Sequence, residues 1–122
     1  MTALAIVTDF CAAWDRLDWQ AVYAALADDI VYHNIPMPPC VGIDAFKAFI
    51  AGFPVSSAQF EIHHIVASGN VVMTERTDRF LLAGRQIVIR VMGIFVLKDS
   101  KISEWRDYFD LAESASQMPP PA

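Results

Sequence analysis

The sequence has little sulfur, little histidine and little positive charge. Its 122 residues include two cysteines, three histidines and nine Lys or Arg residues, against fourteen Asp or Glu residues. Cys11 and Cys40 form no CxxC or Cys/His pattern, so free thiols are expected rather than a disulfide framework or a metal site. The net charge of −5 provides no basic cluster to meet phosphates, which argues against binding to nucleic acid or to an anionic membrane.

Long hydrophobic runs are also missing. A transmembrane helix needs about 20 consecutive, mostly apolar residues, and no stretch of the chain provides them. The first residues, MTALAIVTDF, lack the basic segment of a secretory signal peptide and reach Asp9 early. We therefore expect a cytoplasmic protein that does not associate with membranes. We also expect one domain over residues 1–122, because no linker or repeat interrupts the chain.

Apolar residues, by contrast, are plentiful: 55% of the chain is hydrophobic and 11% is aromatic, which suits a substantial core. They recur at helical spacing over 2–15 and over 43–53. A helix is also expected over 19–27, with Asp18 as its N-cap and Leu26 on its inner face.

The rest of the chain reads as strands and turns. A strand over 28–35 precedes a loop that holds three of the seven prolines. Further strands are expected over 58–68, 71–82, 86–97 and 102–111, followed by a flexible, proline-rich tail over 114–122. In the first of these strands, regular alternation would place Phe60, His64 and Val66 on one face. Helices followed by sequential strands indicate an α+β fold, with helices covering one face of a curved, mostly antiparallel sheet.

The strand over 86–97 is apolar on both faces. One face can line the core, and the other face needs a cover. A second copy of the chain would supply that cover and make the protein a homodimer. Cover by a helix or by the tail of the same chain is the alternative.

Charged residues stand in the middle of the strand over 71–82, in the stretch TERTDRF. Because alternate residues of a strand face opposite ways, Arg76 and Asp78 share one face and lie about 7 Å apart. Their side chains can therefore converge on a common partner.

The last predicted strand supplies that partner. Asp107 lies on the apolar face of the strand, between Trp105 and Phe109. A buried carboxylate is costly unless it is paired, so Arg76 is its natural partner. The sequence thus predicts that Asp78, Arg76 and Asp107 form a cluster around a cavity.

Such a cluster can be purely structural, as many buried Arg–carboxylate groups are. It can also perform general acid–base catalysis, because two carboxylates in low dielectric need not both be ionised. Tyr32 and Asn34 share a face of the first strand, where a hydroxyl and an amide could hold a water molecule. The same two residues can also be read as the capped end of a strand.

With these residues assembled, the sequence resembles the limonene-1,2-epoxide hydrolase family from the first helix to about Leu111. The stretches YHNIPMPP, TERTDRFLLAGR and ISEWRDYFDL carry the resemblance, in this order. The family has a cone-shaped curved sheet of the kind found in SnoaL-like cyclases, ketosteroid isomerases and other nuclear-transport-factor-2-like proteins. The resemblance implies this cone, with the N-terminal helices packed over its concave face.

The resemblance also implies a role for five residues, none of which departs from the family pattern. Asp107 would deprotonate a water molecule that Tyr32 and Asn34 also hold. Asp78 would give a proton to the epoxide oxygen, and Arg76 would bridge both carboxylates. The reaction would convert an epoxide and water into a vicinal diol in one step, without a metal or an organic cofactor.

Asp78 is expected to carry the shared proton at neutral pH, because Asp107 has more partners to stabilise its charge. The pocket should be apolar and suit a small hydrophobic epoxide. Candidate wall residues, each equally explained as core, are Phe109, Phe80, Ile89, Val91 and Met37.

Two other functions are compatible with these features. An isomerase or polyketide cyclase would also place an Asp in an apolar cavity, but it moves protons at carbon and needs no positioned water. A non-catalytic, dimeric module that binds hydrophobic ligands would need only a structural cluster. Tyr32 and Asn34, together with Arg76 between two carboxylates, favour attack by water.

Overall fold

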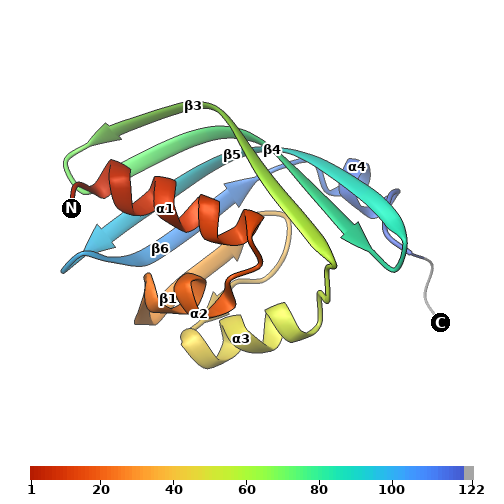
Figure 1. Cartoon of the computed structure of the whole chain (residues 1–122), viewed down its shortest axis with the longest axis horizontal. Helices are drawn as coiled ribbons and strands as arrows, with labels where there is room; N and C mark the ends of the chain where they lie inside the picture. The colour runs from red at the N-terminus through yellow and green to blue at the C-terminus, as the bar shows by residue number, and fades with distance from the viewer. Residues whose placement is uncertain (120–122) are drawn as a thin grey trace.

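The computed structural model describes residues 1–119 and shows an α+β fold built on one curved, six-stranded sheet (Figure 1). The strands are β1 (Leu26–Asn34), β2 (Cys40–Val41), β3 (Ser57–Ser68), β4 (Val71–Leu82), β5 (Arg85–Lys98) and β6 (Lys101–Tyr108). Their spatial order is β2-β1-β6-β5-β4-β3. The β1–β6 pair is parallel and the other pairs are antiparallel, which confirms the mostly antiparallel sheet.

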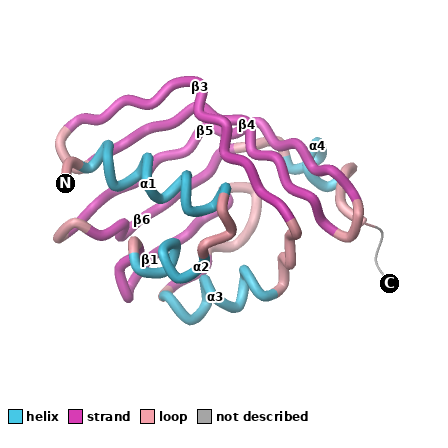
Figure 2. Tube along the Cα trace, viewed as in Figure 1, coloured by secondary structure: helices cyan, strands magenta, loops and turns pink. Residues whose placement is uncertain are grey.

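The helices are α1 (Ala3–Asp15), α2 (Trp19–Ala24), α3 (Ile43–Ala51) and α4 (Leu111–Ala115). The first three lie on the concave side of the sheet, as expected, and α4 lies apart from them near the C-terminus (Figures 1 and 2). Within residues 1–119, no helix is both long enough and apolar enough to cross a membrane.

The second helix is shorter than the sequence suggested. Asp18 caps it as expected, by accepting a 3.1 Å hydrogen bond from a backbone N–H of the first turn. The helix ends at Ala24, however, and Leu26 is the first residue of β1 rather than part of a helical face. Leu26 pairs with Ile102 of β6, whose backbone N–H donates to the carbonyl of Ala25 at 2.9 Å. Strand pairing therefore overrides the helix propensity of the Ala- and Leu-rich segment.

β3 contains an irregularity that simple alternation does not anticipate. Its pairing with β4 shifts register between Ile62 and His64. The shift places His64 and Val66 on the outer face, where both are exposed, and turns Ile65 towards the helices, opposite the buried Thr74. The expectation that His64 and Val66 share the inner face with Phe60 is wrong, because the bulge reverses the alternation.

The C-terminal segment contains a short helix that the sequence analysis did not predict. β6 ends at Tyr108 rather than at 111, and α4 begins after Asp110. The Asp110 carboxylate caps this helix by accepting a 3.0 Å hydrogen bond from the N–H of Glu113. Residues 114 and 115 of the predicted tail belong to α4, and the residues up to 118 form the turns that follow it. The last three residues of the predicted tail, 120–122, lie outside the described residues.

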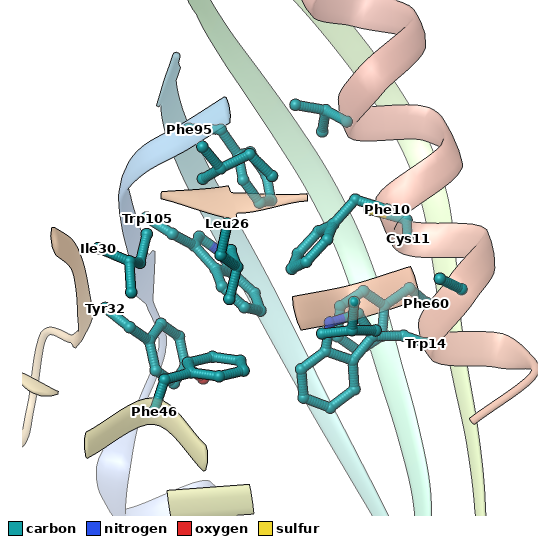
Figure 3. Close-up of a cluster of buried hydrophobic side chains, with 14 of the residues drawn as sticks. Phe10, Cys11, Trp14, Leu26, Ile30, Tyr32, Phe46, Phe60, Phe95 and Trp105 are labelled. Carbon is teal, nitrogen blue, oxygen red and sulfur yellow. The ribbon is translucent and has the colours of Figure 1, made fainter. Parts of the chain in front are cut away.

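An aromatic core fills the space between α1 and the sheet (Figure 3). Phe10 of α1 meets the ring of Trp105 edge-on at 5.1 Å, and Phe95 of β5 stacks on the same ring at 5.3 Å. Trp14 of α1 stacks on Phe60 of β3 at 4.9 Å. Such pairs add about 0.5–1.5 kcal/mol beyond the burial of their area. They fix the inner face of the strands on which the polar residues stand.

Candidate active site

β4 places Thr74, Arg76 and Asp78 on its inner face, where all three are buried. The Arg76 guanidinium donates from Nε to Oδ1 of Asp78 at 3.0 Å and from Nη2 to Oδ2 at 2.8 Å. Its Nη1 donates to Oγ1 of Thr74 at 2.8 Å. The forked contact fixes the carboxylate in the plane of the guanidinium.

β6 brings Asp107 to the same guanidinium from across β5. Nη2 of Arg76 donates to Oδ2 of Asp107 at 3.0 Å, so both carboxylates share this one nitrogen. The other oxygen of Asp107, Oδ1, accepts a 2.8 Å hydrogen bond from the indole N–H of Trp105. The predicted cluster of two Asp residues and one Arg is therefore present. Asp107 does not have more partners among these side chains, because each carboxylate accepts two hydrogen bonds.

Gly93 of β5 leaves room for the guanidinium to cross between the strands. Its register partners are Thr74 on β4 and Asp107 on β6, so it lies beneath the polar cluster. A Cβ atom on Gly93 would collide with Nη1 of Arg76 and would lie 2.6 Å from Oδ1 of Asp107. The need for glycine here is steric, since its backbone is ordinary extended strand.

The cluster consists of one guanidinium and two carboxyl groups that are almost completely buried. The side chain of Arg76 is 0% exposed, and those of Asp78 and Asp107 are each 5% exposed. Burial raises the pKa of Asp78 to about 6, although Arg76 opposes the shift; the charge of Asp107 adds to it. Burial alone would lower the pKa of Arg76, but the two carboxylates hold it well above its usual value. Arg76 therefore stays charged, and Asp78 holds its proton below about pH 6, which is lower than the neutral pH expected from the sequence.

Two aromatic rings enclose the guanidinium. The central carbon of Arg76 lies 4.9 Å from the ring centre of Phe60 and 5.9 Å from that of Phe95. A cation over an aromatic face is attracted to it, and the attraction strengthens where water is excluded. The rings therefore stabilise the positive charge and hold the guanidinium plane in place.

β1 places Tyr32 and Asn34 beside the carboxylates. Parallel pairing sets Tyr32 opposite Trp105 and Asn34 opposite Asp107. The Tyr32 hydroxyl donates to Oδ1 of Asn34 at 3.1 Å, a bond that uses neither the amide hydrogens of Asn34 nor the lone pairs of Tyr32. Burial, with the charge of Asp107 adding to it, holds the pKa of Tyr32 well above its usual value. Tyr32 therefore remains a phenol, and both side chains retain groups that can bind water.

A largely apolar cavity of about 490 Å³ opens in front of the carboxylates. Four of the predicted polar residues line it: Tyr32, Asn34, Asp78 and Asp107. All five predicted wall residues line it as well: Met37, Phe80, Ile89, Val91 and Phe109. Arg76 lies behind the carboxylates, where its side chain is fully buried. The structure thus brings the predicted residues to one site, and their roles in a reaction stay predictions.

Helices α3 and α4 supply wall residues that the sequence analysis missed. These are Phe49 in α3 and Phe53 just after it, and Leu111, Ser114, Ala115 and Met118 in and after α4. The signal for α4 was in the sequence, because Asp110 precedes Glu113 by three residues, the spacing of a helical capping pattern. Trp105 and Thr74 were likewise missed as hydrogen-bonding partners of the cluster.

Polar contacts fasten α4 and the following turn to β5. Arg90 donates to both carboxylate oxygens of Glu113, at 3.1 and 2.7 Å. The side-chain amide of Gln117 accepts from the backbone N–H of Val88 at 2.7 Å and donates to its carbonyl at 2.8 Å. One wall of the cavity is thus formed by a segment that side-chain hydrogen bonds, rather than sheet pairing, hold in place.

Other titratable side chains lie away from the cavity. His63 and His64 are exposed on the sheet, and Cys11 is buried in α1. Burial raises the pKa of the Cys11 thiol to about 12, which keeps it protonated. Among residues 1–119, no group of three or more His, Cys, Asp or Glu side chains is placed to hold a metal ion.

We expect Gly93→Ala to break the cluster. The added methyl group must push Arg76 away from Asp107, which leaves a buried carboxylate with one partner fewer. Losing a partner of a buried ion pair costs about 3–5 kcal/mol. Urea unfolding of the variant should show a loss of this order. Gly52→Ala, after α3 at a residue with φ −83° where a Cβ meets only ordinary contacts at 3.6 Å or more, tests the effect of losing a glycine elsewhere. Equal stability of Gly93→Ala and the parent protein would contradict this account.

We expect Asp78→Asn to remove the loss of stability that the parent protein undergoes as the pH rises through about 6. The pKa of Asp78 is raised on folding, so the folded state binds the proton more tightly than the unfolded state does. The resulting stability is fully present below about pH 4 and is lost as the pH rises through about 6. Asparagine is neutral at every pH, although its amide nitrogen cannot accept one of the two hydrogen bonds that Arg76 donates to Asp78. That lost bond costs the variant the same free energy at every pH, so the comparison is between pH values. Relative to the parent protein, the unfolding free energy of the variant should be about 2–3 kcal/mol higher at pH 8 than at pH 4. A difference between variant and parent that does not depend on pH would contradict the assignment.

The chain is similar to known proteins over most of its length. Residues 1–119 match the family model described as the limonene-1,2-epoxide hydrolase catalytic domain. The chain is 35% identical over 111 residues to the epoxide hydrolase EphG of Mycobacterium tuberculosis, an alignment that covers 86% of this chain and 71% of that protein.

Solved structures show the same similarity. An M. tuberculosis epoxide hydrolase described as LEH-like superposes with a TM-score of 0.81 at 33% identity, covering 94% of this chain and 87% of its own. An NTF2-like protein from Burkholderia pseudomallei superposes with a TM-score of 0.87 at 22% identity, covering 97% and 98% of the two chains. The second likeness shows the cone-shaped fold alone. The family model and the 35% identical relative show more: the chain belongs to the limonene-1,2-epoxide hydrolase family.

Proposed function

We propose that the protein hydrolyses a small hydrophobic epoxide to a vicinal diol in one step, by general acid–base catalysis. The observation that carries the proposal is the pair of carboxylates bridged by Arg76, which face an apolar cavity beside Tyr32 and Asn34. Membership of the family supports an epoxide as the substrate. Ring strain makes the epoxide reactive, so the protein has to position water and transfer two protons.

Asp107 acts as the base in this proposal. A water molecule bound by Tyr32 and Asn34 gives a proton to the Asp107 carboxylate as its oxygen attacks a ring carbon. Register pairing supports this role, because Asn34 stands directly opposite Asp107 on the neighbouring strand. The Tyr32–Asn34 hydrogen bond fixes the two side chains that would hold the water.

Asp78 acts as the acid. As the new C–O bond forms, the C–O bond of the ring breaks, and Asp78 gives its proton to the leaving oxygen. The raised pKa of Asp78 supports this assignment, and a bound apolar substrate would raise it further by excluding water. Arg76 holds both carboxylates throughout and stabilises whichever one is ionised.

Turnover moves one proton from Asp78 to Asp107 by way of water and substrate. The resting state returns when that proton passes back to Asp78. Both Oδ2 atoms contact Nη2 of Arg76, so the two carboxylates are close neighbours and a water in the cavity can carry the proton between them. No covalent ester is formed, and the diol leaves with both oxygens as hydroxyl groups.

The test is a panel of neutral epoxides, followed by mass analysis of the products. Diol formation supports hydrolysis, whereas an isomer of unchanged mass would indicate an isomerase. A single turnover in water labelled with oxygen-18, with enzyme in excess over substrate, tests the one-step mechanism. One-step hydrolysis puts the label in the diol in that first turnover. An ester mechanism would instead transfer an unlabelled carboxylate oxygen first.

Asp107→Asn should abolish hydrolysis while leaving the fold intact. The amide has the shape of the carboxylate but cannot take up a proton from water. The loss of kcat should be about 10²–10⁴-fold or more, measured at saturating epoxide. Asp9→Asn on the exposed face of α1 is the matched control and should be fully active. Near-normal turnover by Asp107→Asn would show that Asp107 is not the base.

The rate should depend on pH as a bell. It falls in acid as the base takes up a proton, and it falls in alkali as Asp78, whose pKa is raised by burial, loses its proton. Asp78→Asn should slow ring opening and remove the alkaline fall. Arg76→Lys should also reduce the rate strongly, because an ammonium group cannot span two carboxylates as a planar fork does. A parent rate that keeps rising in alkali, with an active Asp78→Asn variant, would contradict an acid at this position.

A homodimer is part of the proposal. The outer face of the sheet carries a row of apolar side chains in register, formed by Val66 on β3, Met73 on β4 and Ile94 on β5. Val66 is 62% exposed and Met73 is 45% exposed, which is unusual for large apolar residues side by side. A second copy placing the same face against this row would bury it.

We expect sedimentation at micromolar concentration to give twice the chain mass of 13.6 kDa. Met73→Glu should shift the protein to monomers, because it places a charge in the middle of the apolar row. Val41→Glu, at an exposed apolar position on β2, tests the effect of adding a charge elsewhere. A parent protein that sediments only as a monomer would contradict the dimer.

A further inference from the structure

Trp105 makes a contact that the reaction described above does not use. Its indole Nε1 donates a hydrogen bond to Oδ1 of Asp107 at 2.8 Å, and the ring is 1% exposed. Residues two apart on a strand share a face, so β6 itself presents this donor to the carboxylate. A hydrogen bond to an ionised acceptor is stronger than a neutral one, so the N–H favours the charged form of Asp107.

Packing from both sides fixes the direction of this N–H. Phe95 of β5 stacks on the Trp105 ring at 5.3 Å and 19°, and Tyr32 of β1 lies over it at 4.4 Å (Figure 3). Both rings belong to the register partners of Trp105 on the neighbouring strands. The indole thus cannot turn without displacing Tyr32, which is one of the two groups proposed to hold the water.

We propose that Trp105 is a positioning residue for the base, an inference that rests on the function proposed above. Its N–H donates to Oδ1 of Asp107, while Arg76 donates to Oδ2. These two hydrogen bonds prevent rotation of the carboxylate and fix the orientation of its remaining lone pairs. Its ring carries Tyr32 on one face, so the same side chain sets the position of the base relative to the water. Trp105 itself contacts neither water nor epoxide in this role.

The charged and titratable groups around Asp107 come from three other elements. Arg76 and Asp78 face it from β4, Tyr32 faces it from β1, and the neutral thiol of Cys11 lies on α1 within range of its charge. All four remain when only the indole N–H is removed. A change in the pH profile on removing that N–H can therefore be assigned to Trp105.

The experiment replaces Trp105 by 3-benzothienylalanine, which keeps the two fused rings and exchanges N–H for sulfur. The kcat should fall about tenfold with KM unchanged, and the acid limb of the kcat profile should move up by about one pH unit. The alkaline limb, which belongs to Asp78, should not move. The same replacement at Trp19, which is half-buried and packs on Trp14 at 5.0 Å, is the matched control and should leave the profile unchanged.

Trp105→Phe provides a second variant that any expression host can make. It removes the N–H together with one ring, so it should show the same shift of the acid limb plus a loss of unfolding free energy. An unmoved acid limb in both variants would overturn the proposal, even if stability falls, because a residue with only a packing role would behave in this way.

A second readout separates this proposal from the proposed function. The carboxyl carbon of Asp107, labelled with carbon-13 and assigned with Asp107→Asn, can be titrated by NMR in the parent and in the benzothienyl variant. If the parent hydrolyses no epoxide, the proposed function fails, and the titration still shows whether the indole N–H favours ionised Asp107. A midpoint that is equal in the two proteins would overturn the role of Trp105 irrespective of activity.

Discussion

The buried guanidinium of Arg76 is the constraint on which the rest of the site depends. It joins β4 to β6 across β5 by donating to Asp78 and Asp107, and its burial makes every one of these bonds costly to lose. The crossing is possible because β5 contributes Gly93, whose missing side chain leaves room for the guanidinium. Aromatic rings on β3 and β5 then enclose the charge. The register of β4, β5 and β6 and the aromatic packing on β3 and β5 together surround this one cation.

The proposed chemistry depends on the same burial. In water, both carboxylates would be ionised and neither could act as an acid at neutral pH. Burial raises the pKa of Asp78 against the pull of Arg76, so the fold loses stability at the pH values at which Asp78 is ionised. The two carboxylates have different hydrogen-bond partners. Asp78 receives both of its hydrogen bonds from Arg76, whereas Asp107 receives one from Arg76 and one from Trp105 and stands opposite Asn34.

Alternation along the strands was enough to predict the cluster, because side chains of a strand alternate between its two faces with a period of two residues. Both β4 around Arg76 and β6 around Asp107 follow this alternation. Alternation failed in β3, where the shift of register after Ile62 depends on pairing with β4 and leaves no mark in the local pattern. The end of α2 was also set by a distant partner, since Leu26 pairs with β6. The capping signal of α4 was local, but the proline-rich segment after it favoured a flexible tail. The walls that α4 contributes were missed for that reason.

The arrangement of charge also limits what the cavity can accept. The guanidinium is fully buried behind the carboxylates, and the carboxylates are the groups that line the cavity. The polar end of the cavity therefore presents a carboxylate or a protonated carboxyl group to a ligand. An anionic ligand would be repelled by the carboxylate and could not reach the guanidinium. A neutral ligand with a weakly basic oxygen has no such penalty, and it can accept the proton of Asp78 while the apolar walls bury its carbon atoms. An epoxide carried on a hydrocarbon frame has these properties, whereas an acid or a phosphate ester does not.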